Sequence, residues 1–247
     1  MKTWKGLITS VAIASLTLLS YPGVSFGLDC SYGGVFNPPL PSQNGFCVAS
    51  GALKTLGSLN IDASSWLFVA GPLTLNVNEQ PLQGFPFSLI PGSLTIEPGG
   101  VMGTLPPSNL GPIQITAVGA INNVGGALNL WAPNDTVTLK AGKGISLQGN
   151  PAVGFDPTSL IVGDTVELKT TKGNITLNNN TVLFSLGDEA DVSLVAPRGT
   201  ITLANTTIFV LKSGGAEFGI CNFQAKTQAN VIFGPNTNLG CIPNIKK

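Results

Sequence analysis

The residues best suited to chemistry are three neighbouring acids, Asp188, Glu189 and Asp191. Glycoside hydrolysis needs two carboxylates about 5 to 10 Å apart in a groove, so this group is the first candidate for catalysis. Asp135 and Asp164 precede similar segments of the chain and form a second series with Asp191. Asp188 and Glu189 lie in a polar connection, however, where solvated structural acids are ordinary. We therefore expect no catalytic residue, and these three acids are the least improbable machinery if the chain is an enzyme.

Histidine is absent from the 247 residues. Its absence excludes Ser-His-Asp and Cys-His catalysis and any imidazole metal ligand. The sequence also lacks the Asp-x-Asp-x-Asp string and the glycine-rich nonapeptide that bind calcium in proteins. We expect no metal site and no cofactor.

A series of basic residues is the second candidate site. Lys143, Lys172 and Arg198 each stand four residues after a leucine that ends an alternating segment, and each is followed by glycine. If these segments stack, the three cations form a row at the strand spacing of about 4.8 Å. Such a row would bind a surface glycan or another anionic polymer. The alternative is that solvated cations at exposed corners only keep the protein soluble.

The four cysteines lie in two pairs at opposite ends of the chain, Cys30 with Cys47 and Cys221 with Cys241. Their spacing fits no CxxC metal knuckle. Four cysteines allow three pairings, and the distance along the chain between the two pairs favours the local one. A disulfide that closes a loop of about 15 to 20 residues contributes roughly 3 kcal/mol in the chain-entropy model.

The first part of the chain reads as a secretory signal peptide, residues 1–27. A short basic lead-in precedes an apolar stretch at 7–19, and Ser25 and Gly27 place small residues before a cut at Leu28. The apolar stretch is too short for a membrane span, and no later stretch is long enough. We expect the mature chain to be secreted, extracellular or at a cell surface, which suits disulfide formation.

The charge of the mature chain limits its partners. Removal of the two lysines in the leader leaves 10 basic against 12 acidic residues, a net charge of about −2. Charged residues make up 10% of the sequence, against a usual quarter. A polybasic nucleic-acid footprint is absent, so we expect no nucleic-acid partner. The oligomeric state stays open.

These candidate residues must be held by short strands, since apolar and polar residues alternate along most of the chain. The strands recur at offsets of 29 and 26 residues, and three series share these offsets. The series are Val137, Val166 and Val192; Ile145, Ile175 and Ile201; and Val153, Val182 and Ile208. Three short strands returning every 26 to 29 residues indicate one turn of a solenoid. The sequence predicts an all-β, right-handed parallel β-helix with a dry interior.

The corners of such a helix are also visible in the sequence. Gly149, Asn179 and Asn205 each stand two residues beyond the end of a second strand. Glycine and asparagine enter the left-handed backbone region at low cost, so we expect a stacked bend there.

The repeat region resembles a known family. Residues 115–132 have the cadence Gly-x-Ile-x-Asn, Gly-Gly-x-Leu-x-Leu-x-Ala, and residues 192–203 are similar. This cadence resembles the repeats of filamentous-haemagglutinin-type secreted β-helix proteins, over about residues 58–211. The resemblance implies a right-handed β-helix on or beyond the cell surface, used in adhesion or as a stalk.

The ends of the chain read as caps, because an open solenoid end exposes apolar interior and unpaired strand edges. We expect an N-terminal cap at 28–57, repeats at 58–213 and a C-terminal cap at 214–247. The function we expect is a non-enzymatic structural or adhesive module. The alternatives are a polysaccharide-cleaving hydrolase or lyase and a carbohydrate-binding module.

Overall fold

The computed structural model describes residues 30, 32–40, 42–43, 46–63, 65–82, 85–104, 111–149, 159–213 and 217–246. The expected signal peptide and Val153 lie outside these residues. Among the described residues, no helix is of a length and apolarity that would carry it across a membrane.

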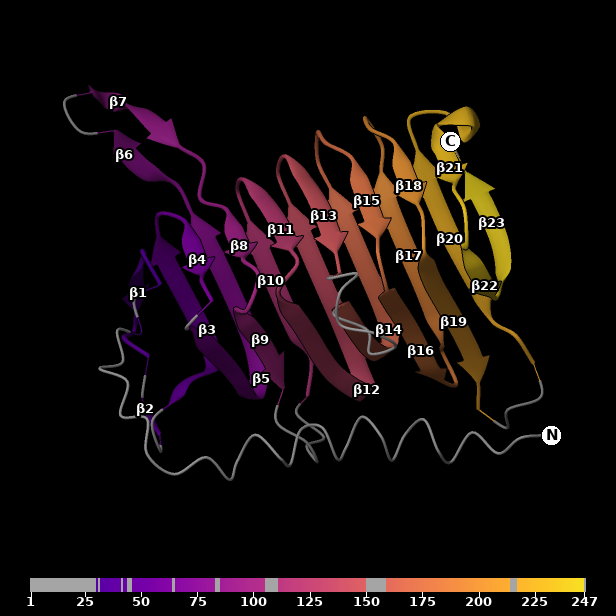
Figure 1. Ribbon diagram of the computed structural model, residues 1–247, viewed down its shortest axis with the longest axis horizontal. Coiled ribbons are helices and arrows are strands. Elements are labelled where there is room, and N and C mark those ends of the chain that lie inside the picture. The colour runs from indigo at the N-terminus through magenta and orange to yellow at the C-terminus, as the bar shows by residue number, and fades with distance from the viewer. Residues whose placement is uncertain are drawn as a thin grey trace.

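Parallel strands stacked turn upon turn make up nearly all of the structure (Figure 1). The larger sheet contains β1 (Val35–Asn37), β2 (Ser42–Gln43), β3 (Phe46–Leu56), β5 (Trp66–Asn78), β9 (Val101–Thr104), β10 (Ile113–Ala117) and β12 (Ala127–Ala141). It continues with β14 (Ser159–Thr170), β16 (Thr181–Gly187), β17 (Asp191–Ala196), β19 (Thr206–Lys212), β20 (Ile220–Ala225), β22 (Asn238–Gly240) and β23 (Ile242–Lys246).

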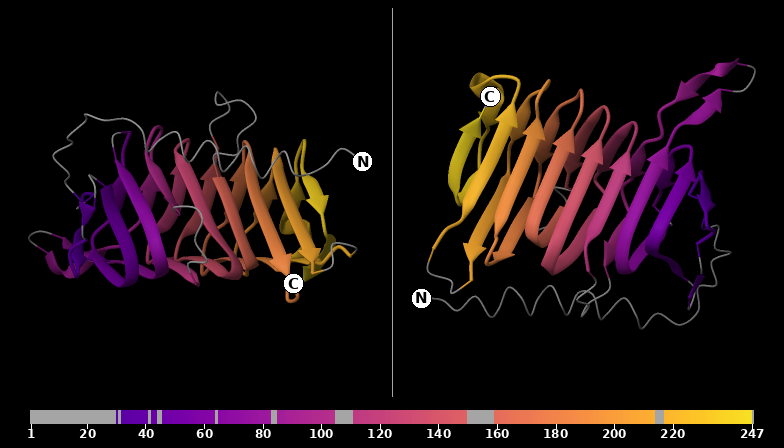
Figure 2. Two further views of the ribbon diagram at one scale, coloured as in Figure 1. Left: turned by 90° about the horizontal axis from the view of Figure 1, so that it is seen from below. Right: turned by 180° about the vertical axis from the view of Figure 1, so that it is seen from behind.

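A second sheet closes the solenoid on its other side (Figure 2). Its strands are β4 (Leu59–Ile61), β8 (Leu94–Ile96), β11 (Ala120–Val124), β13 (Gly144–Gln148), β15 (Ile175–Asn178), β18 (Ile201–Leu203) and β21 (Val231–Phe233). A short 3-10 helix, η2 (Gln228–Asn230), precedes the last of them. The parallel β-helix predicted from the repeat is confirmed.

Two of the three predicted series stack in register. Val166 pairs with Val137 on one side and Val192 on the other, and all three side chains are completely buried. In the second sheet Ile175 pairs with Ile145 and Ile201 in the same way. These columns form the interior because alternate side chains of a strand point to the same face.

The third series was wrong by one residue. Val182 of β16 pairs with Thr207, whereas Leu183 pairs with Ile208. Leu183 and Ile208 are fully buried, while Val182 is half-buried. Because side chains alternate with a period of two, a slip of one residue exchanges the inner and outer faces of the strand.

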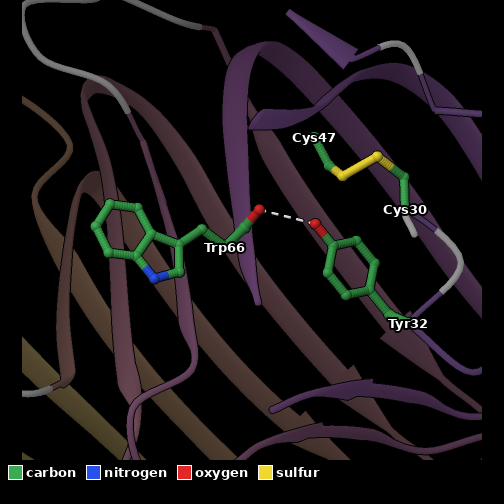
Figure 3. Close-up of a disulfide and its surroundings, with 4 residues drawn as sticks. All are labelled: Cys30, Tyr32, Cys47 and Trp66. Atoms are coloured by element: carbon green, nitrogen blue, oxygen red, sulfur yellow. Dashed lines mark hydrogen bonds between the residues drawn. A yellow bond between two sulfur atoms is a disulfide. The ribbon is translucent and has the colours of Figure 1, made fainter. Parts of the chain in front are cut away.

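The N-terminal end is covered by strands that run against the solenoid. β1 and β2 pair antiparallel with β3, and β3 itself already stacks in parallel on β5. The predicted disulfide Cys30–Cys47 fastens this end. Figure 3 shows the disulfide beside Tyr32, whose hydroxyl donates a hydrogen bond of 2.8 Å to the carbonyl oxygen of Trp66.

The second predicted disulfide, Cys221–Cys241, lies at the other end of the solenoid. It joins β20 to the residue between β22 and β23. β20 stacks in parallel on β17, and β23 stacks in parallel on β20. Parallel stacking therefore continues through the C-terminal residues that the structure describes.

The predicted asparagine bends are present. Asn179 and Asn205 have φ angles of 45° and 46°, in the left-handed region. One corner, by contrast, is interrupted by an antiparallel hairpin, β6 (Gln80–Leu82) and β7 (Phe85–Ile90). Figure 1 and Figure 2 show this hairpin projecting away from the stacked turns.

Candidate functional site

Glycines shape the corner that carries the predicted basic row. At Gly173 an added Cβ atom would lie 1.1 Å from the carbonyl oxygen of Lys143, and at Gly199 it would lie 2.1 Å from that of Gly173. No side chain fits at such an approach, whatever the backbone angles. Glycine therefore lets each turn stack closely on the turn before it at this corner, and the neighbouring cations lie exposed at the surface.

Two members of the predicted row come together. The amide of Lys172 donates a hydrogen bond of 3.1 Å to the carbonyl oxygen of Gly142, which places Lys172 beside Lys143. Both lysines line a cavity of about 620 Å³ at this corner. Arg198 is exposed in the next turn and is not among the residues that line the cavity.

Sequence reasoning missed two further lysines of the same cavity. Lys140 of β12 pairs in register with Lys169 of β14, so their side chains leave the sheet on the same face, one strand spacing apart. Both line the cavity with Lys143 and Lys172. The signal was present in the sequence, because Lys140 and Lys169 occur at the same 29-residue offset as the interior valines.

Acids balance part of this charge. Glu79, at the base of the projecting hairpin, lines the cavity with Pro91 from the hairpin's other end. Glu167 does not line the cavity, but its Oε2 atom lies 3.9 Å from Nζ of Lys140, which does. Four ammonium groups thus face two carboxylates, which leaves an excess of positive charge at the cavity.

The wall of the cavity also holds a hydroxyl group with unused hydrogen-bonding capacity. Thr116 of β10 pairs with Lys140 on one side and with Asn76 on the other. Its Oγ1 atom is shielded from solvent and has no hydrogen-bond partner among the described residues. A buried polar group without a partner is costly, so this hydroxyl is an unsatisfied group behind the surface of the cavity.

The predicted acids lie where β17 begins, whereas the cavity lysines lie near and beyond the ends of β12 and β14. Asp188 and Glu189 are exposed in the turn after β16. Asp191 begins β17, and its Oδ1 accepts a hydrogen bond of 2.8 Å from Asn222. Burial raises the pKa of Asp191, against the opposing effects of the Asn222 hydrogen bond and the Lys246 charge.

Asp164 is an acid whose pKa is affected by the charges of several neighbouring acids. Burial raises its pKa above the ordinary aspartate value, and the charges of Glu189, Asp188 and Asp135 raise it further. Its Oδ1 atom is shielded and has no partner within the part of the chain that the structure describes. Gly187 approaches so closely that an added Cβ would lie 1.9 Å from this oxygen. A proton donor needs a raised pKa, so Asp164 and Asp191 suit that role better than Asp188 and Glu189.

Comparison with known proteins adds no relative to these observations. No protein-family model, curated protein or solved structure matches the chain. Within the described residues, no group of three or more His, Cys, Asp or Glu is arranged to hold a metal ion.

Proposed function

We propose that the protein is an exported structural or adhesive module that attaches to an anionic glycan or similar polymer through the lysine-lined cavity. The observation that carries this proposal is that two adjacent turns each supply two lysines to one cavity, Lys140 with Lys143 and Lys169 with Lys172. The two disulfides support an oxidising, exported setting.

The cavity suits a short anionic stretch that lies along the solenoid axis. Lys140 and Lys169 occupy one outward column, which continues as Thr116 on one side and Val195 on the other. The column also holds Lys54 and Lys246 further along the solenoid, but these two lysines do not line the cavity. Carboxylate or sulfate groups that follow one another along the polymer would meet these lysines in turn.

The proposal is tested by titrating the protein with a polyuronate, a sulfated polysaccharide and a neutral polysaccharide. We expect binding to an anionic polymer that weakens as salt is added, because exposed charges are screened. The double variant Lys140→Ala, Lys169→Ala removes two cation contacts worth about 1 kcal/mol each at most, so affinity falls by up to about thirtyfold.

Lys54 provides the matched control. It is exposed and stands in the same outward column, three turns before Lys140, outside the cavity. Lys54→Ala should leave the affinity unchanged. Equal loss in Lys54→Ala and in the double variant would show that overall charge, and not the cavity, attracts the polymer. Absence of binding to every anionic polymer would refute the attachment role.

Polysaccharide cleavage is the second candidate function, and the raised pKa of Asp164 is the observation that favours it. The assay is release of reducing ends or unsaturated products from neutral and acidic polysaccharides. We expect no turnover. Turnover that disappears in Asp164→Asn, or in the double variant Asp188→Asn, Asp191→Asn, would establish this second function instead.

A further inference from the structure

The corner that carries the predicted basic row continues past the cavity. Lys143 and Lys172 stand in two successive turns of this corner, and both line the cavity. In the following turn, Gly199 approaches Gly173 so closely that an added Cβ would lie 2.1 Å from the carbonyl oxygen of Gly173. Arg198 therefore stands beside Lys172, because each of these two cations directly precedes one of the two glycines.

A fourth cation extends the row by one more turn. The amide of Lys226 donates a hydrogen bond of 3.1 Å to the carbonyl oxygen of Gly199, which places Lys226 in the turn stacked on Arg198. Sequence reasoning did not include Lys226, because threonine and not glycine follows it. The corner row thus consists of Lys143, Lys172, Arg198 and Lys226, all exposed and each in its own turn. At the strand spacing of about 4.8 Å, its three intervals span about 14 Å.

The charge of the corner row is not neutralised by neighbouring acids. No aspartate or glutamate occurs in the four segments that form this corner, which are residues 141–144, 170–174, 196–200 and 225–230. Within the described part of the chain, none of the four cations takes part in an ion pair, in contrast to Lys140, which faces Glu167. The corner row is therefore a line of uncompensated positive charge, although the whole chain has as many acids as bases.

The corner row stops at the side of the projecting hairpin. The amide of Lys143 donates a hydrogen bond of 2.9 Å to the carbonyl oxygen of Gly119, so the preceding corner carries no cation. The amide of Gly119 bonds in turn to Gly92, just after the hairpin, and Glu79 at the base of the hairpin lines the cavity. An anionic chain meets a carboxylate at this end, which favours its extension toward Lys226.

We propose that the corner row binds a polyuronate with a carboxylate on every sugar, which lies along the corner over four consecutive turns. This inference rests on the proposed attachment role and extends the site beyond the cavity. One carboxylate per sugar matches one cation per turn, because a 1,4-linked pyranose ring advances a chain by about the distance between stacked strands. Complementary charges fix the register of such a contact. A polymer in which charged and neutral sugars alternate leaves every second cation without a partner.

Isothermal titration calorimetry with oligogalacturonates of two and four sugars tests the length of the site. The disaccharide meets the two cations of the corner row that line the cavity, and the tetrasaccharide also reaches Arg198 and Lys226. We expect the tetrasaccharide to bind more tightly by up to about thirtyfold, because each exposed cation contributes at most about fivefold. A hyaluronan tetrasaccharide, in which charged and neutral sugars alternate, should bind no more tightly than the galacturonate disaccharide.

The double variant Arg198→Gln, Lys226→Gln should lower the affinity for the tetrasaccharide to about that for the disaccharide. It should leave the affinity for the disaccharide unchanged. Both side chains are exposed, so the variant retains the fold, which far-ultraviolet circular dichroism verifies. The matched control is Lys54→Gln, Lys212→Gln, which removes the same charge from two exposed lysines outside the corner row and should keep the full gain with length.

Equal affinity for the two galacturonates overturns the inference, and so does a gain with length that survives Arg198→Gln, Lys226→Gln. Equal losses in this variant and its matched control, or equal binding of the two tetrasaccharides, also overturn it. In each of these cases the cavity role stands if Lys140→Ala, Lys169→Ala still weakens binding. Absence of binding to these oligosaccharides and to every longer anionic polymer refutes the attachment role and the inference together.

Discussion

The inner face of β16 can be determined by truncating two neighbouring residues. Leu183 pairs with Ile161 on one side and with Ile208 on the other, and all three are fully buried. Val182, one residue earlier, is half-buried on the outer face. The two residues are adjacent in β16, but their side chains lie on opposite faces of the sheet.

The expected costs follow from this burial. Leu183→Ala removes buried carbon atoms from a site whose strand is hydrogen-bonded on both sides, so the surrounding turns cannot collapse into the space. Such substitutions cost about 3 to 5 kcal/mol when the cavity persists. Val182→Ala removes two methyl groups that are about half in solvent already, at roughly 0.8 kcal/mol per fully buried group, so it costs about 1 kcal/mol or less.

Urea unfolding followed by circular dichroism measures both values. An unchanged dependence on urea concentration would show that the same cooperative unit unfolds in each variant. A larger loss for Val182→Ala than for Leu183→Ala would contradict the register and restore the column of Val153, Val182 and Ile208 that the repeat offsets suggest.

Three further predictions concern the interior, the acids and the C-terminal disulfide. Val166→Asp should destabilise the protein by several kcal/mol, measured by urea unfolding, because it buries an unpaired carboxylate between two valines. Burial, and then the neighbouring acids, raise the pKa of Asp164, so the folded chain binds a proton at this carboxyl more tightly than the unfolded chain does. The free energy of unfolding should therefore fall as the pH rises from the ordinary aspartate pKa through the raised one. Asp164→Asn should flatten this dependence in melts from pH 3 to 7; an unchanged slope would contradict the assignment. Replacing Cys221 and Cys241 by alanine together should cost about 3 kcal/mol for the 20-residue separation, measured against the intact protein in urea.

The interior columns could be predicted from sequence because the hydrophobic pattern shows unambiguously which alternate residues of these strands are buried. In the segments that begin at Val137 and Val166, apolar residues alternate with polar ones, so one face alone can be buried. The disulfides followed from position, since each cysteine pair lies at one end of the chain.

The register of β16 could not be predicted in the same way. Val182, Leu183 and Phe184 are apolar at three consecutive positions, so the pattern permits either face to be buried. The structure turns Phe184 outward, where it stacks on Phe209 with ring centres 5.8 Å apart. This contact between aromatic rings accompanies a choice of face that the hydrophobic pattern leaves open.

Only part of the candidate site could be predicted from the sequence, and the reason is geometric. Lys143 and Lys172 share a corner position, which a repeat reveals. Lys140 and Lys169 lie near the ends of their strands, and they line the same cavity at a corner where glycine lets successive turns stack closely. Glu79 arrives from the base of an inserted hairpin, outside any repeat. Proximity of this kind depends on how the corner folds in three dimensions.

The Cys221–Cys241 bond has a mechanical consequence for a protein that serves as an attachment. Each turn of a solenoid contacts its neighbours alone, so a pull along the axis peels strands from the end, one turn after another. A turn of 26 residues, such as that from Val166 to Val192, would release about 90 Å of chain. A force applied beyond β23, however, reaches Cys241 and passes through the disulfide to Cys221. β21 and β22 lie between these two cysteines and carry none of the load, so the terminal turn stays folded while tension is transmitted to the turns behind it.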